Sequence, residues 1–145
     1  MYKGLLHTHS FLRWILLILL IWVVIDAFRG YFSGRKFEKK NDKTNLFLFI
    51  VSHIQFLVGI ILYLISPIVK NALMSVSTAM KTPELRFYLV EHGLAMTIAV
   101  ALITIGRIVA KKAPSDKAKF GRLAVYNTLA LLVILSMIPW SRGLF

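Results

Sequence analysis

The chain has 145 residues, 58% of them hydrophobic, and carries 18 Lys and Arg against 6 Asp and Glu, for a net charge of +12. A mean hydropathy of +0.73 sets it apart from soluble domains, which are only about half apolar. The absence of cysteine excludes disulfides, thiolate metal sites and thioether-linked haem.

Four apolar segments predict transmembrane helices, because crossing a bilayer as a helix takes about 20 apolar residues. In chain order they cover approximately residues 11–28, 46–65, 87–109 and 123–138. None alternates apolar with polar residues, as a membrane strand would. We therefore expect an all-α membrane protein of one domain, residues 1–145, built as a four-transmembrane-helix bundle. The bulky, basic sequence after the first segment indicates an uncleaved helix rather than a signal peptide.

A short amphipathic segment is expected on the outer surface between the second and third helices. Pro67 ends the second helix and Pro83 precedes the third. Between them, apolar residues recur at helical spacing: Ile68, Val69, Ala72, Leu73, Val76 and Met80. Such a segment lies in the membrane interface, either as a lid over a site or as a plain connector.

The basic residues predict the orientation in the membrane. Six of the 18 Lys and Arg lie in residues 29–43 and six more in residues 107–122. Short loops rich in Lys and Arg stay in the cytoplasm, so both chain ends are expected on the outer side. Topology and anionic lipid headgroups account for this charge, and we expect no nucleic-acid partner.

All four histidines lie within or at the mouth of a predicted span: His7, His9, His53 and His92. Ionisable side chains in lipid are costly and usually face the interior of a bundle. Imidazole is the common axial ligand of haem iron, and two facing helices can each supply one. The histidines therefore suggest a bis-histidine haem b. The alternative is hydrogen bonding between helices, or an interfacial position for His7 and His9.

Depth in the membrane favours one pairing of ligands. At about 1.5 Å rise per residue, His9 and His92 fall in the outer half, whereas His53 lies about 14 Å deeper than His92. We expect His9 with His92, with His7 as the alternate to His9 and the pairing of His53 with His92 left open. Arg13, one turn from His9 on the same helix face, is the expected partner of a haem propionate.

Glu91 is the one carboxylate beside a candidate ligand. Next to His92 and half-buried, it is a candidate for carrying the proton released when a quinol is oxidised. The alternative is a salt bridge to Arg86 or Arg13. A non-haem metal site of two histidines and Glu91 is less natural, because adjacent side chains on a helix point about 100° apart.

A resemblance to known membrane proteins supports the haem interpretation. The matching stretches are "GLLHTHSFLRW", "SHIQFLVGIILYLISP", "LRFYLVEHGLAM", "ITIGR" and "SMIPW". Together they resemble small four-helix membrane proteins of Bacteroidota that are labelled cytochrome b. A looser similarity to the bacterial cytochrome b561 type rests on a histidine that opens the first helix and another in the second, as His9 and His53 do. The last predicted helix lacks the histidines of that type, so His92 would take their role.

The expected function is electron transfer by a b-type haem between a quinol and a periplasmic-side acceptor, or within a respiratory assembly. The expected location is the bacterial inner membrane, as a multi-pass protein with both termini in the periplasm. The expected partners are lipid, a quinol, and other membrane subunits or further copies of the chain. The alternative is a cofactor-free accessory or scaffold subunit. A weaker alternative is a proton or metal-ion path through His9, Glu91, His92 and His53.

Overall fold

The computed structural model describes residues 1–142, which form helices and connecting turns with no strand. Four helical segments are long and apolar enough to cross a membrane, and they confirm the predicted all-α, four-helix architecture. They are α1 (Tyr2–Ser33), α2 (Lys39–Ile65), the segment Pro83–Lys111 and α7 (Asp116–Ser136). The third segment comprises α5 (Pro83–Arg86), a π-helical turn η1 (Phe87–Glu91) and α6 (His92–Lys111). The chain is thus a multi-pass membrane protein.

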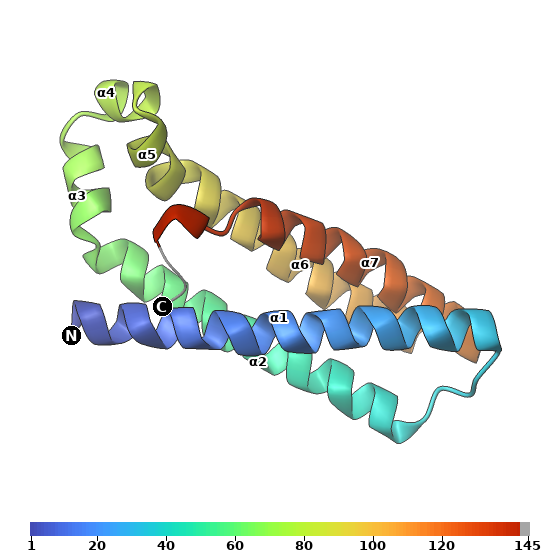
Figure 1. The fold of residues 1–145 in the computed structure, drawn as a ribbon. Coiled ribbons are helices and arrows are strands. Elements are labelled where there is room, and N and C mark those ends of the chain that lie inside the picture. The colour runs from blue at the N-terminus through green and yellow to red at the C-terminus, as the bar shows by residue number, and fades with distance from the viewer. Residues whose placement is uncertain (143–145) are drawn as a thin grey trace.

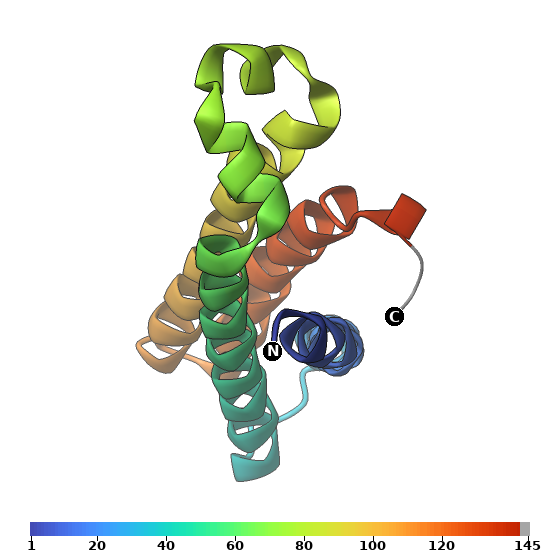
Figure 2. The same ribbon diagram turned by 90° about the vertical axis from the view of Figure 1, so that its left-hand side faces the viewer.

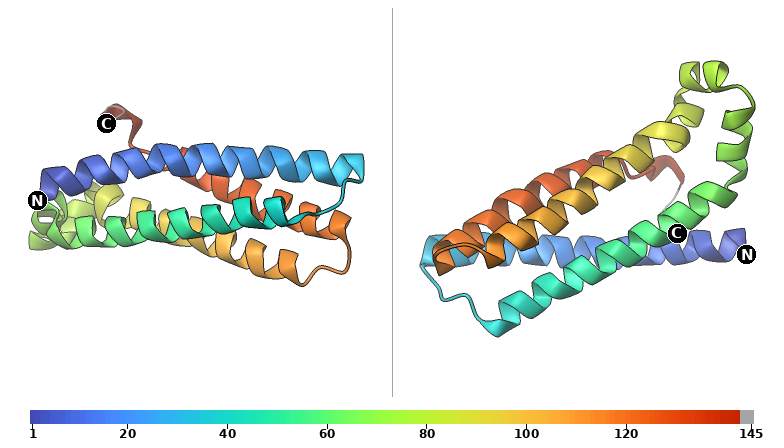
Figure 3. Two further views of the ribbon diagram at one scale, coloured as in Figure 1. Left: turned by 90° about the horizontal axis from the view of Figure 1, so that it is seen from below. Right: turned by 180° about the vertical axis from the view of Figure 1, so that it is seen from behind.

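The four long helices are arranged so that α1 and α6 stand at opposite corners. α1 packs against α2 and α7, and α6 packs against the same two helices. Toward the end that carries the N-terminus, α1 and α2 diverge from α6 and α7 (Figures 1 and 2). The view from behind in Figure 3 shows the same divergence. The bundle is therefore closed at one end and splayed at the other.

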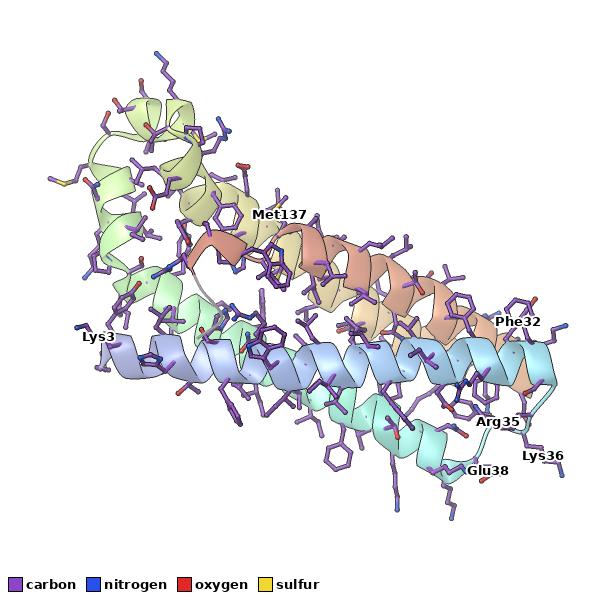
Figure 4. All side chains as sticks on the ribbon, in the orientation of Figure 1. Lys3, Phe32, Arg35, Lys36, Glu38 and Met137 are labelled. Carbon is purple, nitrogen blue, oxygen red and sulfur yellow. The ribbon has the colours of Figure 1, made fainter. Side chains whose placement is uncertain are left out.

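The two ends of the bundle differ in what they carry. The N-terminus, the outer segment between α2 and α5, and a short 3-10 turn η2 (Trp140–Arg142) lie at the splayed end (Figure 1). The α1–α2 and α6–α7 connections lie at the closed end. Figure 4 shows Lys3 at the splayed end, and Arg35, Lys36 and Glu38 together at the other. The two most basic connections therefore share one side.

The helices extend beyond the apolar segments predicted from sequence, because polar and charged residues continue the helices outside the apolar region. α1 begins nine residues before the predicted segment, so that His7 and His9 are helical. α2 begins at Lys39 behind a capping box, in which the side chains of Glu38 and Asn41 each accept from the other's backbone N–H. α7 ends at Ser136, two residues before the predicted end. Pro139, which has no N–H to donate, accounts for that early end.

The outer segment forms two short helices rather than one. They are α3 (Pro67–Met74) and α4 (Val76–Lys81), separated by Ser75, which is in an extended conformation. Ser66 caps α3, accepting a hydrogen bond from the backbone N–H of Val69. A small apolar core packs this segment against η1. The core is formed by Val69, Ala72, Ala79 and Leu89.

The main apolar core lies at the centre of the bundle, where Leu20, Leu48, Ile103 and Ala130 are fully buried. Many large apolar side chains point outward instead, as expected for contact with lipid. Those more than half exposed within the four long helices include Phe11, Ile18, Trp22, Phe47, Leu57, Leu64, Leu94, Val125 and Leu132.

Side chains at the closed end join the helices by polar contacts. Asp26 of α1 accepts hydrogen bonds from Arg35 (2.6 Å) and Asn41 (2.7 Å). Arg107 of α6 donates to Asn45 Oδ1 (2.7 Å) and forms an ion pair with Asp42 (3.3 Å), both on α2. These contacts fix the end of the bundle opposite the splayed one.

Candidate functional site

A cavity of about 590 Å³ lies between the helices at the splayed end. Its volume falls in the range of cofactor and small-molecule sites, about 300–1,000 Å³. α1, α2, η1, α6, α7 and the turn after α7 all contribute to its walls. The ionisable side chains in its lining, apart from tyrosines, are His7, His9, Arg13, His92 and Arg142. No carboxylate lines the cavity among the described residues, so its lining favours a ligand with negative charge.

His92, the first residue of α6, is oriented by the end of α7. Its ring nitrogen Nδ1 lies 2.8 Å from the carbonyl oxygen of Met137. A carbonyl only accepts, so the proton of the neutral imidazole is on Nδ1. Nε2 is then the nitrogen with a free lone pair. A histidine whose other nitrogen donates to a carbonyl is the usual arrangement for a metal ligand.

His9 lines the cavity from α1, on the opposite corner of the bundle from α6. Its Nδ1 is buried and has no hydrogen-bond partner among residues 1–142. The ring packs against Gly59 of α2, where an added Cβ would meet His9 Cε1 at 3.2 Å. His92 and Arg13 line the same cavity. The structure thus brings the favoured pair to one cavity.

Arg13 and His7 lie on the same helix as His9 but differ in setting. Arg13 lines the cavity one turn along α1, with its guanidinium carbon 5.4 Å from the ring centroid of Trp14. His7 also lines the cavity but is largely exposed. The position of Arg13 suits a partner of a propionate, and the exposed position of His7 suits an interfacial residue.

His53 is not brought to the cavity. It lies on the outward face of α2, exposed, with Nδ1 2.7 Å from the carbonyl oxygen of Phe49 in its own helix. Its ring packs on that of Phe49, 4.2 Å between centroids. Ser52 and Gln55, its near neighbours in sequence, are the residues of this turn that face the interior. The geometry gives no support to pairing His53 with His92.

Glu91 also lies outside the lining of the cavity. Its carboxylate forms an ion pair with Arg86, 3.2 Å from Nε to Oε1, and Arg86 also donates to the carbonyl of Met80. The structure therefore contains the salt bridge weighed as an alternative to proton transfer. The ion pair joins α5 to η1, and the hydrogen bond to Met80 joins α5 to α4.

The outer segment covers only the rim of the cavity. Val69 of α3 contributes to the lining, whereas α4 contributes no residue. At the same rim, the Tyr63 hydroxyl of α2 donates to the carbonyl of Leu89 in η1, at 2.9 Å. π-helical turns are frequent at functional sites, and this one immediately precedes His92.

Sequence reasoning missed three residues that shape the site: Met137, Gly59 and Gln55. Met137 acts through its backbone, for which Pro139 two residues later was the one visible signal. Gly59 and Gln55 share a helix face with Ser52 and Ser66, at spacings of three, four and seven residues. This stripe of small and polar residues marks the interior face of α2, and it would have separated that face from His53.

The donors in the cavity fit haem iron better than a non-haem metal. In residues 1–142, no three His, Cys, Asp or Glu side chains are grouped so that they could hold a metal ion. Two imidazoles on opposing helices are what a six-coordinate haem needs. The Met137 carbonyl holds Nδ1 of His92, which leaves Nε2 of that ring for such a ligand, and Nδ1 of His9 has no hydrogen-bond partner within residues 1–142.

No protein family, curated protein or solved structure matches the chain significantly.

Proposed function

We propose that the chain is a b-type cytochrome of the membrane, in which His9 and His92 hold one haem in the cavity at the splayed end. The observation that carries this proposal is the hydrogen bond between His92 Nδ1 and the Met137 carbonyl, 2.8 Å long. It fixes the tautomer and the ring plane while Nε2 stays available.

The remaining walls suit a flat, dianionic macrocycle. Beyond the two histidines the cavity is lined by apolar side chains such as Leu16, Met96 and Ile103. Ala99, fully buried on α6, gives room for a ring to approach the helix. Arg13 and Arg142 provide cations at the same cavity, where they can pair with propionates.

When bound, haem supplies one-electron chemistry, which the side chains of this chain lack. His9 and His92 would hold the group, and the other side chains of the cavity would exclude water and set the local charge. We infer that the electrons pass between a quinol in the bilayer and an acceptor at the outer face, or within a respiratory assembly. The position of the cavity in one half of the bundle supports an exchange on that side.

The location we propose is a bacterial inner membrane with the splayed end in the periplasm. The two most basic connections lie together at the closed end (Figure 4). Short basic loops remain in the cytoplasm, so the cavity then faces outward.

The test is a dithionite-reduced minus oxidised absorption spectrum of protein produced with haem supplied, together with the ratio of haem to protein. We expect a sharp b-type α band at close to one haem per chain. His9→Ala and His92→Ala should each remove the low-spin spectrum, whereas His53→Ala should leave it intact. His7→Ala, on the same helix as His9, is the matched control for a neighbouring exposed histidine.

A featureless spectrum from folded wild-type protein would refute the cytochrome proposal. The cofactor-free accessory subunit would then be the better account, and copurifying membrane subunits would be the next object of study. Loss of haem in His53→Ala but not in His9→Ala would refute the pairing while leaving a cytochrome.

A further inference from the structure

The π-helical turn η1 changes the helical register of the third span immediately before His92. The backbone N–H of His92 bonds to the carbonyl of Phe87, five residues back, where an α-helix uses the carbonyl four residues back. Such turns are rare. Within a membrane, backbone groups that a helix irregularity frees need partners from side chains or neighbouring helices. The shape of η1 therefore depends on contacts beyond its own helix.

Two pairs of side chains show what the π turn does. In an α-helix, side chains five residues apart point about 140° away from each other. Across η1, however, the ring of Phe87 lies 5.5 Å from that of His92, centroid to centroid. Arg86 likewise pairs with Glu91 over five residues, at 3.2 Å from Nε to Oε1. The π turn thus brings Phe87 to the candidate ligand His92 through both its carbonyl and its ring.

Tyr63 of α2 supplies a contact to this turn from outside it. Its hydroxyl donates to the carbonyl of Leu89, in the middle of η1, at 2.9 Å. The side chain of Leu89 is buried in the small core that it forms with α3 and α4. The backbone and the side chain of one η1 residue are therefore both held by elements other than α6.

We propose that Tyr63 is a positioning residue of His92: its hydroxyl keeps η1 in the π form, and the π form keeps the carbonyl and the ring of Phe87 on His92. Together with the Met137 carbonyl at Nδ1, these contacts fix His92 at its backbone, beside its ring and at one ring nitrogen. The inference deepens the proposed function, on which it rests for the identity of the group that His92 binds.

The physical reason is the need of backbone carbonyls for donors inside a membrane. Without the Tyr63 hydroxyl, the carbonyl of Leu89 loses the donor that α2 provides. Regular α-helical bonding is then the available way to satisfy the carbonyls of the turn. A change of η1 to an α-helix carries Phe87 round the helix, away from His92, because five residues no longer share a face.

The first experiment measures the contact between Phe87 and His92 by solid-state NMR on the full chain in lipid bilayers, produced without haem. The protein carries ¹³C-carbonyl phenylalanine and backbone-¹⁵N histidine. No histidine directly follows a phenylalanine in the sequence, so a dipolar contact reports proximity through space. We expect the Phe87–His92 contact in the wild type and its loss in Tyr63→Phe. Phe49 and His53, four residues apart in α2, give a reference contact that stays unchanged.

A deletion provides the rescue. Removing Val90, an exposed residue of η1, shortens the interval between Phe87 and His92 to four residues, which an α-helix bonds directly. Tyr63→Phe combined with this deletion should regain the contact. Tyr126→Phe, which removes a tyrosine hydroxyl from α7, is the matched control and should behave as the wild type. A Phe87–His92 contact that persists in folded Tyr63→Phe would overturn the proposal.

The second experiment reads His92 itself in the same variants. Ring-¹⁵N spectra at about pH 8, where an ordinary imidazole is neutral, should show a fixed Nδ1–H tautomer in the wild type and a mixture in Tyr63→Phe. With haem supplied, Tyr63→Phe should weaken haem binding by about 10-fold, the lower end of the effect of losing a group that orients a metal ligand. The deletion of Val90 should reverse both changes.

The two proposals fail in different ways. If no variant binds haem but the contact and the tautomer of His92 respond as expected, the proposed function fails and the positioning role of Tyr63 stands. If Tyr63→Phe loses the contact while its tautomer and its haem affinity equal those of the wild type, the positioning role fails and the cytochrome proposal stands.

Discussion

The ring nitrogen Nδ1 of His92 lies 2.8 Å from the carbonyl oxygen of Met137, which joins the first residue of α6 to the residue that follows α7. The carbonyl is available because a helix ends there. The last carbonyls of a helix have no partner within it, and Pro139 offers no N–H to extend it. The end of α7 therefore orients His92, a candidate haem ligand.

Replacing Pro139 by Ala should loosen this support. With an N–H at position 139, α7 can continue and Met137 can accept from its own helix. We expect His92 to lose its fixed Nδ1–H tautomer, measured by ¹⁵N NMR, and haem to be retained less tightly. Pro114→Ala, in the connection at the closed end, is the matched control and should change neither property. A wild-type tautomer in Pro139→Ala would contradict this prediction.

Gly59→Ala should displace His9. The added Cβ would stand 3.2 Å from His9 Cε1, closer than most side-chain contacts, so the ring must shift. We expect weaker haem binding with an intact fold, measured by haem content and by the sharpness of the reduced α band. Gly93→Ala is the control, because Gly93 lines the same cavity and its added Cβ would meet nothing within 4 Å. Equal haem content in the two variants would show that His9 needs no such clearance.

Gly106→Ala should destabilise the bundle itself. An added Cβ would lie 2.6 Å from Cβ of Tyr126, an atom fixed to the backbone of α7, so α6 and α7 would have to separate. We expect a loss of about 1–3 kcal/mol in unfolding free energy from overpacking, read as a lower melting temperature in detergent. Gly93→Ala in the same helix should be neutral or stabilising, since alanine is the better helix former. A melting temperature equal to wild type would show that the two helices are not packed this closely.

Arg107→Met should weaken the closed end of the bundle. Arg107 is only 8% exposed and donates to Asn45 Oδ1 at 2.7 Å. Removing it leaves a buried acceptor unsatisfied, at a cost of about 1–3 kcal/mol. Thermal unfolding in detergent measures the loss, and Lys111→Met, an exposed cation one turn further along α6, is the control. If the two variants have the same melting temperature, the contact with Asn45 contributes nothing to stability.

The chain contains no cysteine, so single cysteines can report its orientation without background. Lys3 lies at the splayed end and Lys36 at the closed end (Figure 4). In intact spheroplasts we expect a membrane-impermeant maleimide to label Lys3→Cys, and to label Lys36→Cys only after lysis. The reverse pattern would place the cavity on the cytoplasmic side and overturn the proposed orientation.

Hydropathy predicted the four spans correctly, because the need to bury backbone polar groups in lipid makes each apolar segment a helix regardless of its neighbours. The ends were less well predicted. α1 starts at Tyr2 and α2 at Lys39, since a helix continues into water as long as its residues and caps allow. Sequence depth also placed His9 and His92 in one half of the bundle, where the structure brings them to one cavity.

Only the tertiary structure decided which way each histidine faces. In a soluble helix the polar face is the outer one, but in lipid both faces are apolar, so His53 and His92 look alike in sequence. The packing of the helices distinguishes the two histidines: His53 is exposed on the outward face of α2, whereas His92 contacts the end of α7. The support from Met137 and the contacts of Gln55 and Gly59 with His9 join residues far apart in the chain. The sequence by itself determined a four-helix membrane protein with His7, His9 and His92 toward the end that carries the N-terminus, and the packing of the helices around one cavity determined which histidines line it.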